Sequence, residues 1–114
     1  MRRRRISELE QALLDAPSRS AKALAHFRLA VFHDNNGREI EAIARYRAAI
    51  RLGLRGIQAA QARAWLASSY WKVDRPRQAL AQIAELSRRR LPADLRAWVG
   101  RLDRRVRRKP RKYA

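Results

Sequence analysis

The sequence predicts an all-α fold built from a repeated pair of helices. Its 114 residues are dominated by alanine, leucine, arginine and glutamine, which are good helix formers, and β-branched residues are sparse. In addition, residues 29–50 and 66–87 carry the same pattern of small and bulky positions, 37 residues apart. Because a repeated helical pair stacks on its copy instead of closing into a globule, we expect a short right-handed α-solenoid of about six helices.

The N-terminal part of the chain is expected to hold two helices. Ser7 is predicted to cap the first of them, with Glu10 completing a capping box. A second helix is predicted to begin at Ser18 and to run to about Asn35. A turn that ends at Gly37 follows, because asparagine and glycine tolerate the left-handed backbone that a helix stop requires.

Four more helices are expected after this turn. The third covers roughly residues 38–52 and the fourth roughly residues 57–72. Asp74 is predicted to cap the fifth helix, with Pro76 in its first turn, where a missing N–H costs little. The sixth helix follows Pro92 and carries a single apolar stripe. In the third helix we expect these side chains to point inward: Ile40, Ala42, Ile43, Tyr46, Ala49 and Ile50.

Two stretches of the chain follow one residue pattern. The first copy reads His26, Leu29, Ala30, His33, Gly37, Ala42, Tyr46 and Ala49, and the second reads Leu66, Ala67, Tyr70, Asp74, Ala79, Ile83 and Leu86. This pattern resembles the tetratricopeptide repeat, with two repeats at about 22–54 and 59–91. Three additional residues around Gly53–Arg55, ahead of a long helix, are similar to those of the bacterial tetratricopeptide repeat group 5.

The resemblance implies three parts and a function. Residues 1–16 would form a basic N-terminus with a helix, residues 17–91 the two repeats, and residues 92–114 a capping helix with a basic tail. A protein of this type is expected to be a non-enzymatic scaffold that binds a protein or peptide partner in a groove lined by the first helix of each repeat. The expected groove positions are Phe27, Val31, Asp34, Ser68, Trp71 and Lys72.

Two interpretations of the apolar groove positions stay open. In the first, Phe27, Val31 and Trp71 anchor a peptide or helix, since binding hot spots favour aromatic residues. In the second, the N-terminal helix folds over this surface, so that Phe27 and Val31 belong to the core.

The arrangements that catalysis and metal binding require do not occur in this sequence. The chain has no cysteine, and therefore no disulfide and no thiolate metal site. His26 and His33 stand about 10 Å apart along one helix, too far to share one metal ion. Ser68 and Ser69 lie in no nucleophile-elbow motif. We therefore expect no enzymatic activity, no cofactor and no metal ion.

No stretch of the sequence approaches the length of a membrane span. The run Arg2–Arg5 is followed by charged residues, whereas a secretory signal requires an apolar stretch there. A cytoplasmic bacterial protein without membrane attachment is the expectation.

The formal net charge of +18 is concentrated at the two ends of the chain. Residues 2–5 contribute +4 and residues 88–112 contribute +10. An acidic partner suits this charge. The alternative is a nucleic-acid- or ribosome-associated protein whose basic C-terminal helix binds the phosphate backbone, and a merely solvated arginine-rich end is the third interpretation. The predicted basic patch consists of Arg88, Arg89, Arg90, Arg101, Arg104, Arg105, Arg107 and Arg108.

Two features of the C-terminal part and of the repeats leave alternatives. Trp98 and Tyr113 are expected to stack on bases in the nucleic-acid interpretation, whereas Trp98 otherwise caps the core.

Two repeats also fall short of the roughly three that such stacks usually need for stability. Either the flanking helices or a second copy of the chain, in a homodimer, is expected to supply the rest.

Overall fold

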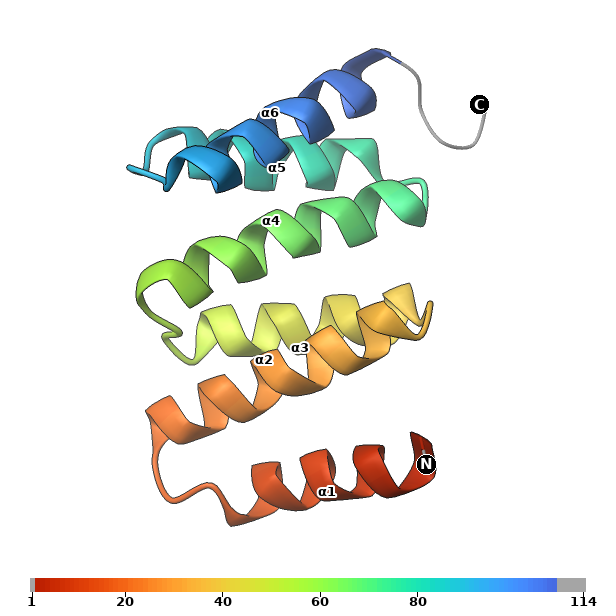
Figure 1. Ribbon diagram of the computed structural model, residues 1–114, viewed down its shortest axis with the longest axis vertical. Coiled ribbons are helices and arrows are strands. Elements are labelled where there is room, and N and C mark those ends of the chain that lie inside the picture. The colour runs from red at the N-terminus through yellow and green to blue at the C-terminus, as the bar shows by residue number, and fades with distance from the viewer. Residues whose placement is uncertain (1, 109–114) are drawn as a thin grey trace. The chain divides into compact units, whose positions relative to one another are not determined.

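The computed structural model describes residues 2–108, except the side chain of Arg2, and this part of the chain is all-α. Tyr113 therefore lies outside the described residues. The six helices of residues 2–108 follow one another as antiparallel neighbours within each of two compact units (Figure 1). The N-terminal unit ends at Arg55 and the C-terminal unit begins at Gly56. The helices are α1 Arg2–Asp15, α2 Arg19–Asn35, α3 Glu39–Arg51, α4 Gly56–Lys72, α5 Pro76–Ser87 and α6 Ala93–Arg108.

The N-terminal unit is a hairpin of α2 and α3, with α1 packed on α2. The hairpin closes tightly because Ala30 and Ala42 are fully buried and let the two helices approach. Tyr46 of α3 is also fully buried, and its hydroxyl donates a 2.9 Å hydrogen bond to Oδ2 of Asp34 on α2. Ser18 caps α2 as predicted, since its hydroxyl accepts the N–H of Ala21 at 3.1 Å.

The C-terminal unit repeats this hairpin in α4 and α5 and adds α6, which packs against both of them. Ala67 and Ala79 are fully buried, as their counterparts are in the N-terminal unit. Its core combines residues from all three helices and from the α5–α6 connection. The core residues are Ala60, Ala64, Ala67, Ala79, Ile83, Leu86, Leu91, Val99, Leu102 and Val106.

The two hairpins close through the same turn, 37 positions apart. In the first, the N–H of Arg38 bonds the carbonyl of His33 at 2.9 Å, and in the second, the N–H of Arg75 bonds the carbonyl of Tyr70 at 2.8 Å. The turn requires a left-handed residue, which is Gly37 with φ 71° in the first copy and Asp74 with φ 63° in the second. The repeat seen in the sequence is therefore a repeat of backbone geometry.

Three local predictions were wrong. Ser7 does not cap α1, because this helix already begins at Arg2. Asp74 does not cap α5: Arg75 occupies the N-cap position, without a side-chain cap bond, and Asp74 is the left-handed turn residue just before it. Ile40 does not point inward, since it lies in the first turn of α3 and is 64% exposed.

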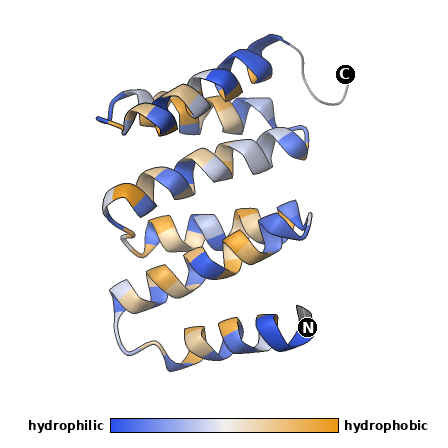
Figure 2. Cartoon of the chain, in the orientation of Figure 1, coloured by the Kyte–Doolittle hydropathy of each residue, from blue (hydrophilic) through white to orange (hydrophobic). Residues whose placement is uncertain are grey.

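Polar and apolar residues separate clearly along the helices. Figure 2 shows the last two turns of α6 as strongly hydrophilic, while apolar residues of α4 and α5 alternate with polar ones. No helix within residues 2–108 is long and apolar enough to cross a lipid bilayer.

Candidate functional site

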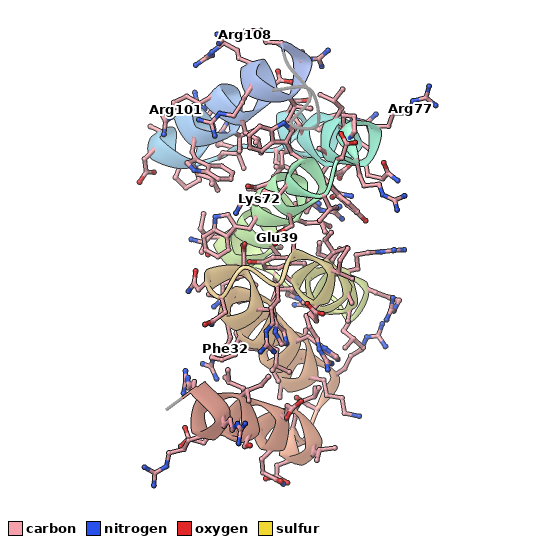
Figure 3. All side chains as sticks on the ribbon, turned by 90° about the vertical axis from the view of Figure 1, so that its right-hand side faces the viewer. Phe32, Glu39, Lys72, Arg77, Arg101 and Arg108 are labelled. Carbon is pink, nitrogen blue, oxygen red and sulfur yellow. The ribbon has the colours of Figure 1, made fainter. Side chains whose placement is uncertain are left out.

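The basic face of α6 follows from its strict amphipathic pattern. Val99, Leu102 and Val106 recur at three- and four-residue intervals and are buried in the core of the C-terminal unit. The arginines between them must therefore face outward. Figure 3 shows Arg101 and Arg108 on α6, and Arg77 extending from the other side of the unit. We call the following exposed residues the α6 arginines: Arg101, Arg104, Arg105, Arg107 and Arg108.

Only two of the α6 arginines are held by side-chain contacts among the described residues. Nε of Arg107 donates a 2.7 Å hydrogen bond to Oδ1 of Asp103, one turn earlier. The guanidinium of Arg105 lies over the indole of Trp71, 5.5 Å from the ring centroid, which is a cation–π contact. Arg101, Arg104 and Arg108 form no ion pair within the described part of the chain. Their charges are thus available to an anionic partner.

The arginines of the predicted basic patch lie in two parts of the C-terminal unit. Arg88, Arg89 and Arg90 are exposed in the connection that leads into α6, and Arg89 pairs with Glu85 at 3.3 Å. These residues precede the first turn of α6, whereas Arg104 lies about 17 Å further along that helix. The three connection arginines therefore lie ahead of the start of α6, and most of the α6 arginines lie in its second half.

An apolar hollow of about 460 Å³ lies between the first halves of α4 and α6. The indoles of Trp65 and Trp98 line it, and Ile57, which is 46% exposed, lies at its edge. Two charged side chains, Asp94 and Arg101, complete the rim. We call this site the tryptophan hollow, and its full lining is Ile57, Gln61, Trp65, Pro92, Asp94, Leu95, Trp98 and Arg101.

The tryptophan hollow arises from a third, partial copy of the repeat. The segment Ala97-Trp98-Val99-Gly100 in α6 answers Ala64-Trp65-Leu66-Ala67 in α4, 33 positions earlier. Leu66 and Val99 are buried, and the tryptophan that precedes each of them is only partly buried. Trp65 and Trp98 therefore occupy equivalent positions on α4 and α6, which are the first helices of the second copy and of the partial third copy. Both indoles line the same hollow.

The comparison with protein families decides the assignment. A family model described as Tetratrico peptide repeat matches residues 23–101, which is more than half of the chain and includes the partial third copy. The chain belongs to the tetratricopeptide repeat family. The match is to group 5 of that family, as the sequence predicted. Neither the curated proteins nor the solved structures gave a match.

Tetratricopeptide repeats generally mediate protein–protein interactions and are generally non-enzymatic scaffolds. The described residues of this tetratricopeptide repeat chain contain no group of three or more histidines, cysteines or acidic residues placed to hold a metal ion.

Three of the predicted groove residues lie on α2 in the N-terminal unit. Phe27 is buried, 8% exposed, with its ring centroid 6.3 Å from that of Tyr46. Val31 is partly buried, and Asp34 is partly buried and accepts the hydrogen bond of Tyr46. Phe27 and Asp34 thus both contact Tyr46, and Phe27 is a core residue of the N-terminal unit.

The other three predicted groove residues lie on α4 in the C-terminal unit. Ser68, Trp71 and Lys72 are each partly buried. Trp71 packs against the core of this unit and lies under Arg105, so it links α4 to the basic face of α6. The sequence pattern predicts Trp71 as a groove residue. In the structure, the guanidinium of Arg105 lies over its ring.

The two histidines of α2 do not form a site. Nδ1 of His26 lies 3.2 Å from a guanidinium nitrogen of Arg45, and burial together with this charge lowers the pKa of His26. His33 is buried, and its Nδ1 has no hydrogen-bond partner among the described residues. Burial, followed by the charge of Arg38, lowers the pKa of His33 below its usual value. Because both pKa values are lowered from about 6.5, both rings are mainly neutral at pH 7.

Reasoning from the sequence missed the tryptophan hollow. The repeat pattern gives Trp65 no role, and it presents Trp98 only as a core cap or as a platform for bases. The signal was present, since Ala-Trp-Leu-Ala and Ala-Trp-Val-Gly are nearly the same four residues. This signal does not stand out, because its spacing of 33 differs from the 37 that relates the two full copies.

Proposed function

We propose that this chain is a non-enzymatic scaffold that binds an acidic protein or peptide partner through its C-terminal unit. Membership of the tetratricopeptide repeat family supports a protein partner. The exposed arginines on α6 are the observation that supports an acidic partner. Among them, Arg101, Arg104 and Arg108 form no ion pair with a described residue.

Unpaired surface arginines favour an anionic partner for two reasons. They attract it over about 8–10 Å at physiological ionic strength, which raises the association rate. They also bind carboxylates with two parallel N–H···O bonds, which a lysine does not do. A second copy of the chain is a poor partner for this face, because each copy has a formal net charge of +18.

The test uses the full chain and two fluorescein-labelled probes at about 0.15 M salt. One probe is a peptide of glutamates around a single phenylalanine, and the other is a single-stranded oligonucleotide of equal formal charge. Fluorescence anisotropy reports binding. We expect the peptide to bind, and we expect the variant with Arg101→Glu, Arg104→Glu and Arg108→Glu to lose that binding.

The control variant carries the same change of charge elsewhere. Arg28, Arg47 and Arg77 are exposed on other helices, and their replacement by glutamate should leave most of the peptide affinity. Equal losses in both variants would mean that only net charge matters, which contradicts a defined site. Binding of the oligonucleotide with a steep salt dependence, without binding of the peptide, would overturn the proposal in favour of phosphate recognition.

A further inference from the structure

We infer that the tryptophan hollow is the anchor site of this scaffold, and that it receives one bulky apolar side chain from an acidic peptide segment whose carboxylates meet the α6 arginines. This inference rests on the proposed function. It names the part of the surface that selects one acidic partner over another.

The size and lining of the hollow suit a side chain. A volume of about 460 Å³ lies within the range of roughly 300–1,000 Å³ that is usual for ligand sites, and it accommodates a single large residue with its backbone. Two indoles face this space together with the aliphatic side chains of Ile57, Pro92 and Leu95. Such a mixture buries an apolar anchor on several sides, which is how binding hot spots are built.

Ile57 is a part of the apolar lining that the core does not require. Ile57 is 46% exposed in the first turn of α4, and it is absent from the core of the C-terminal unit. Exposed isoleucine has an unfavourable contact with water that a bound partner would relieve. Trp65 and Trp98 pack against the core from its edge, and each also lines the hollow.

Charge selects the chemistry around the anchor. Arg101 lies on the rim, and Arg104 and Arg108 follow it along the exposed face of α6 at one-turn intervals. Asp94 is the one acidic residue of the rim. It lies in the first turn of α6, where the helix dipole favours a carboxylate. Its Oδ1 accepts a hydrogen bond from the N–H of Leu95 at 3.0 Å. The net effect is a positive strip that begins at the mouth of an apolar site.

The same observations favour a peptide over a nucleic acid. Bases stack on aromatic faces, but the aliphatic side chains of Ile57, Pro92 and Leu95 add nothing to stacking. The carboxylate of Asp94 on the rim repels any anionic group next to the hollow, and a nucleic acid carries a phosphate beside every base. A peptide can present its apolar residue to the hollow while its own carboxylates lie further along α6.

The experiment compares two peptides that differ only at the anchor. One is the glutamate peptide with a central phenylalanine, and in the other that phenylalanine is replaced by serine. Anisotropy titrations with the full chain should give an affinity about tenfold higher for the phenylalanine peptide, because one aromatic side chain is buried on binding. Tryptophan emission of the chain should move to shorter wavelength with the phenylalanine peptide only.

Two substitutions in the hollow and one matched control locate the effect. Ile57→Ser and Trp98→Ala should each remove most of the tenfold preference for phenylalanine while leaving the affinity for the serine peptide unchanged. Ile40→Ser is the control, since Ile40 is also the second residue of its helix and is 64% exposed. It should retain the preference. Circular dichroism verifies folding, and Ile57→Ser keeps the test valid if Trp98→Ala fails to fold.

The outcomes separate this inference from the proposed function. If both peptides bind equally and the substitution Arg101→Glu weakens both, the function stands and the anchor site is refuted. If neither peptide binds at about 0.15 M salt, the proposed function itself fails. If the oligonucleotide binds and Trp98→Ala weakens it more than it weakens the phenylalanine peptide, the hollow is a base-stacking site and the inference is overturned.

Discussion

Replacing Tyr46 by phenylalanine tests how the N-terminal unit is held together. The hydroxyl of Tyr46 donates a 2.9 Å hydrogen bond to Asp34, and the ring is fully buried between the helices of the hairpin. Burial, with the charge of Asp34 and this hydrogen bond, raises the pKa of Tyr46 far above its usual value, so the hydroxyl remains a donor at any pH of interest. Phenylalanine keeps the ring and removes only the donor.

The expected loss of stability follows from the kind of bond. A hydrogen bond to a charged group contributes about 1.5–3 kcal/mol to the free energy of unfolding. Asp34 is partly exposed, so water replaces part of the lost bond, and we expect the low end, about 1.5 kcal/mol. Asp34 also lies in the last turn of α2, where the helix dipole disfavours a carboxylate. The bond to Tyr46 therefore compensates an unfavourable position.

Urea unfolding followed by circular dichroism measures this effect in a double-mutant cycle. Asp34→Ala should cost less stability in the Tyr46→Phe background than in the natural chain, because the bond between these two side chains is already absent there. Tyr70→Phe is the control and should change stability by less than about 0.5 kcal/mol, because the hydroxyl of Tyr70 makes no hydrogen bond within the described residues. Additive effects of Tyr46→Phe and Asp34→Ala would refute the argument.

Three further predictions concern stability and are checked by thermal unfolding. Ser69→Ala should raise the free energy of unfolding by about 1 kcal/mol, since the buried hydroxyl has no hydrogen-bond partner among the described residues; a lower melting temperature would contradict this. Gly37→Ala should lower the free energy of unfolding by roughly 1–2 kcal/mol, because Gly37 has a φ of 71°. Gly100→Ala should raise it by roughly 0.5–1 kcal/mol, because Gly100 lies in mid-helix with room for a methyl group. If both substitutions change stability in the same direction, the reasoning is refuted. The lowered pKa of His33 means that the unfolded chain binds the proton more tightly, so stability should be full above about pH 6.5 and fall as the pH decreases below it. In His33→Gln this decrease should be smaller, and an unchanged pH profile would exclude His33 as a cause.

The hairpins could be predicted from the sequence because their signals are local. Ser18 precedes an apolar helix and caps it, and Gly37 supplies the left-handed residue of the turn. Both properties depend on a few neighbouring residues. Asp74 was harder, since aspartate favours N-caps and also tolerates the left-handed conformation. Its correspondence to Gly37 in the repeat was the better guide, and it indicated the turn.

The candidate site depends on contacts that the sequence does not display directly. The stripe of Val99, Leu102 and Val106 predicts an exposed basic face on α6, and this part of the site follows from periodicity alone. The tryptophan hollow requires α4 and α6 to pack against each other, although α5 separates them in the sequence. Only the folded unit reveals this contact. Likewise, no pattern in the sequence pairs Arg105 with Trp71 or Tyr46 with Asp34.

The packing of each helix mainly on its neighbours in the chain has a kinetic consequence. Among the principal helix pairs, the most distant in sequence is α4 with α6, and a single helix separates them. Loops that close such contacts are short, so little chain entropy is lost before favourable contacts form. Folding should therefore take microseconds to milliseconds, with nucleation inside one hairpin. If α6 unfolds transiently, it should therefore refold before a protease cleaves it or another protein binds it.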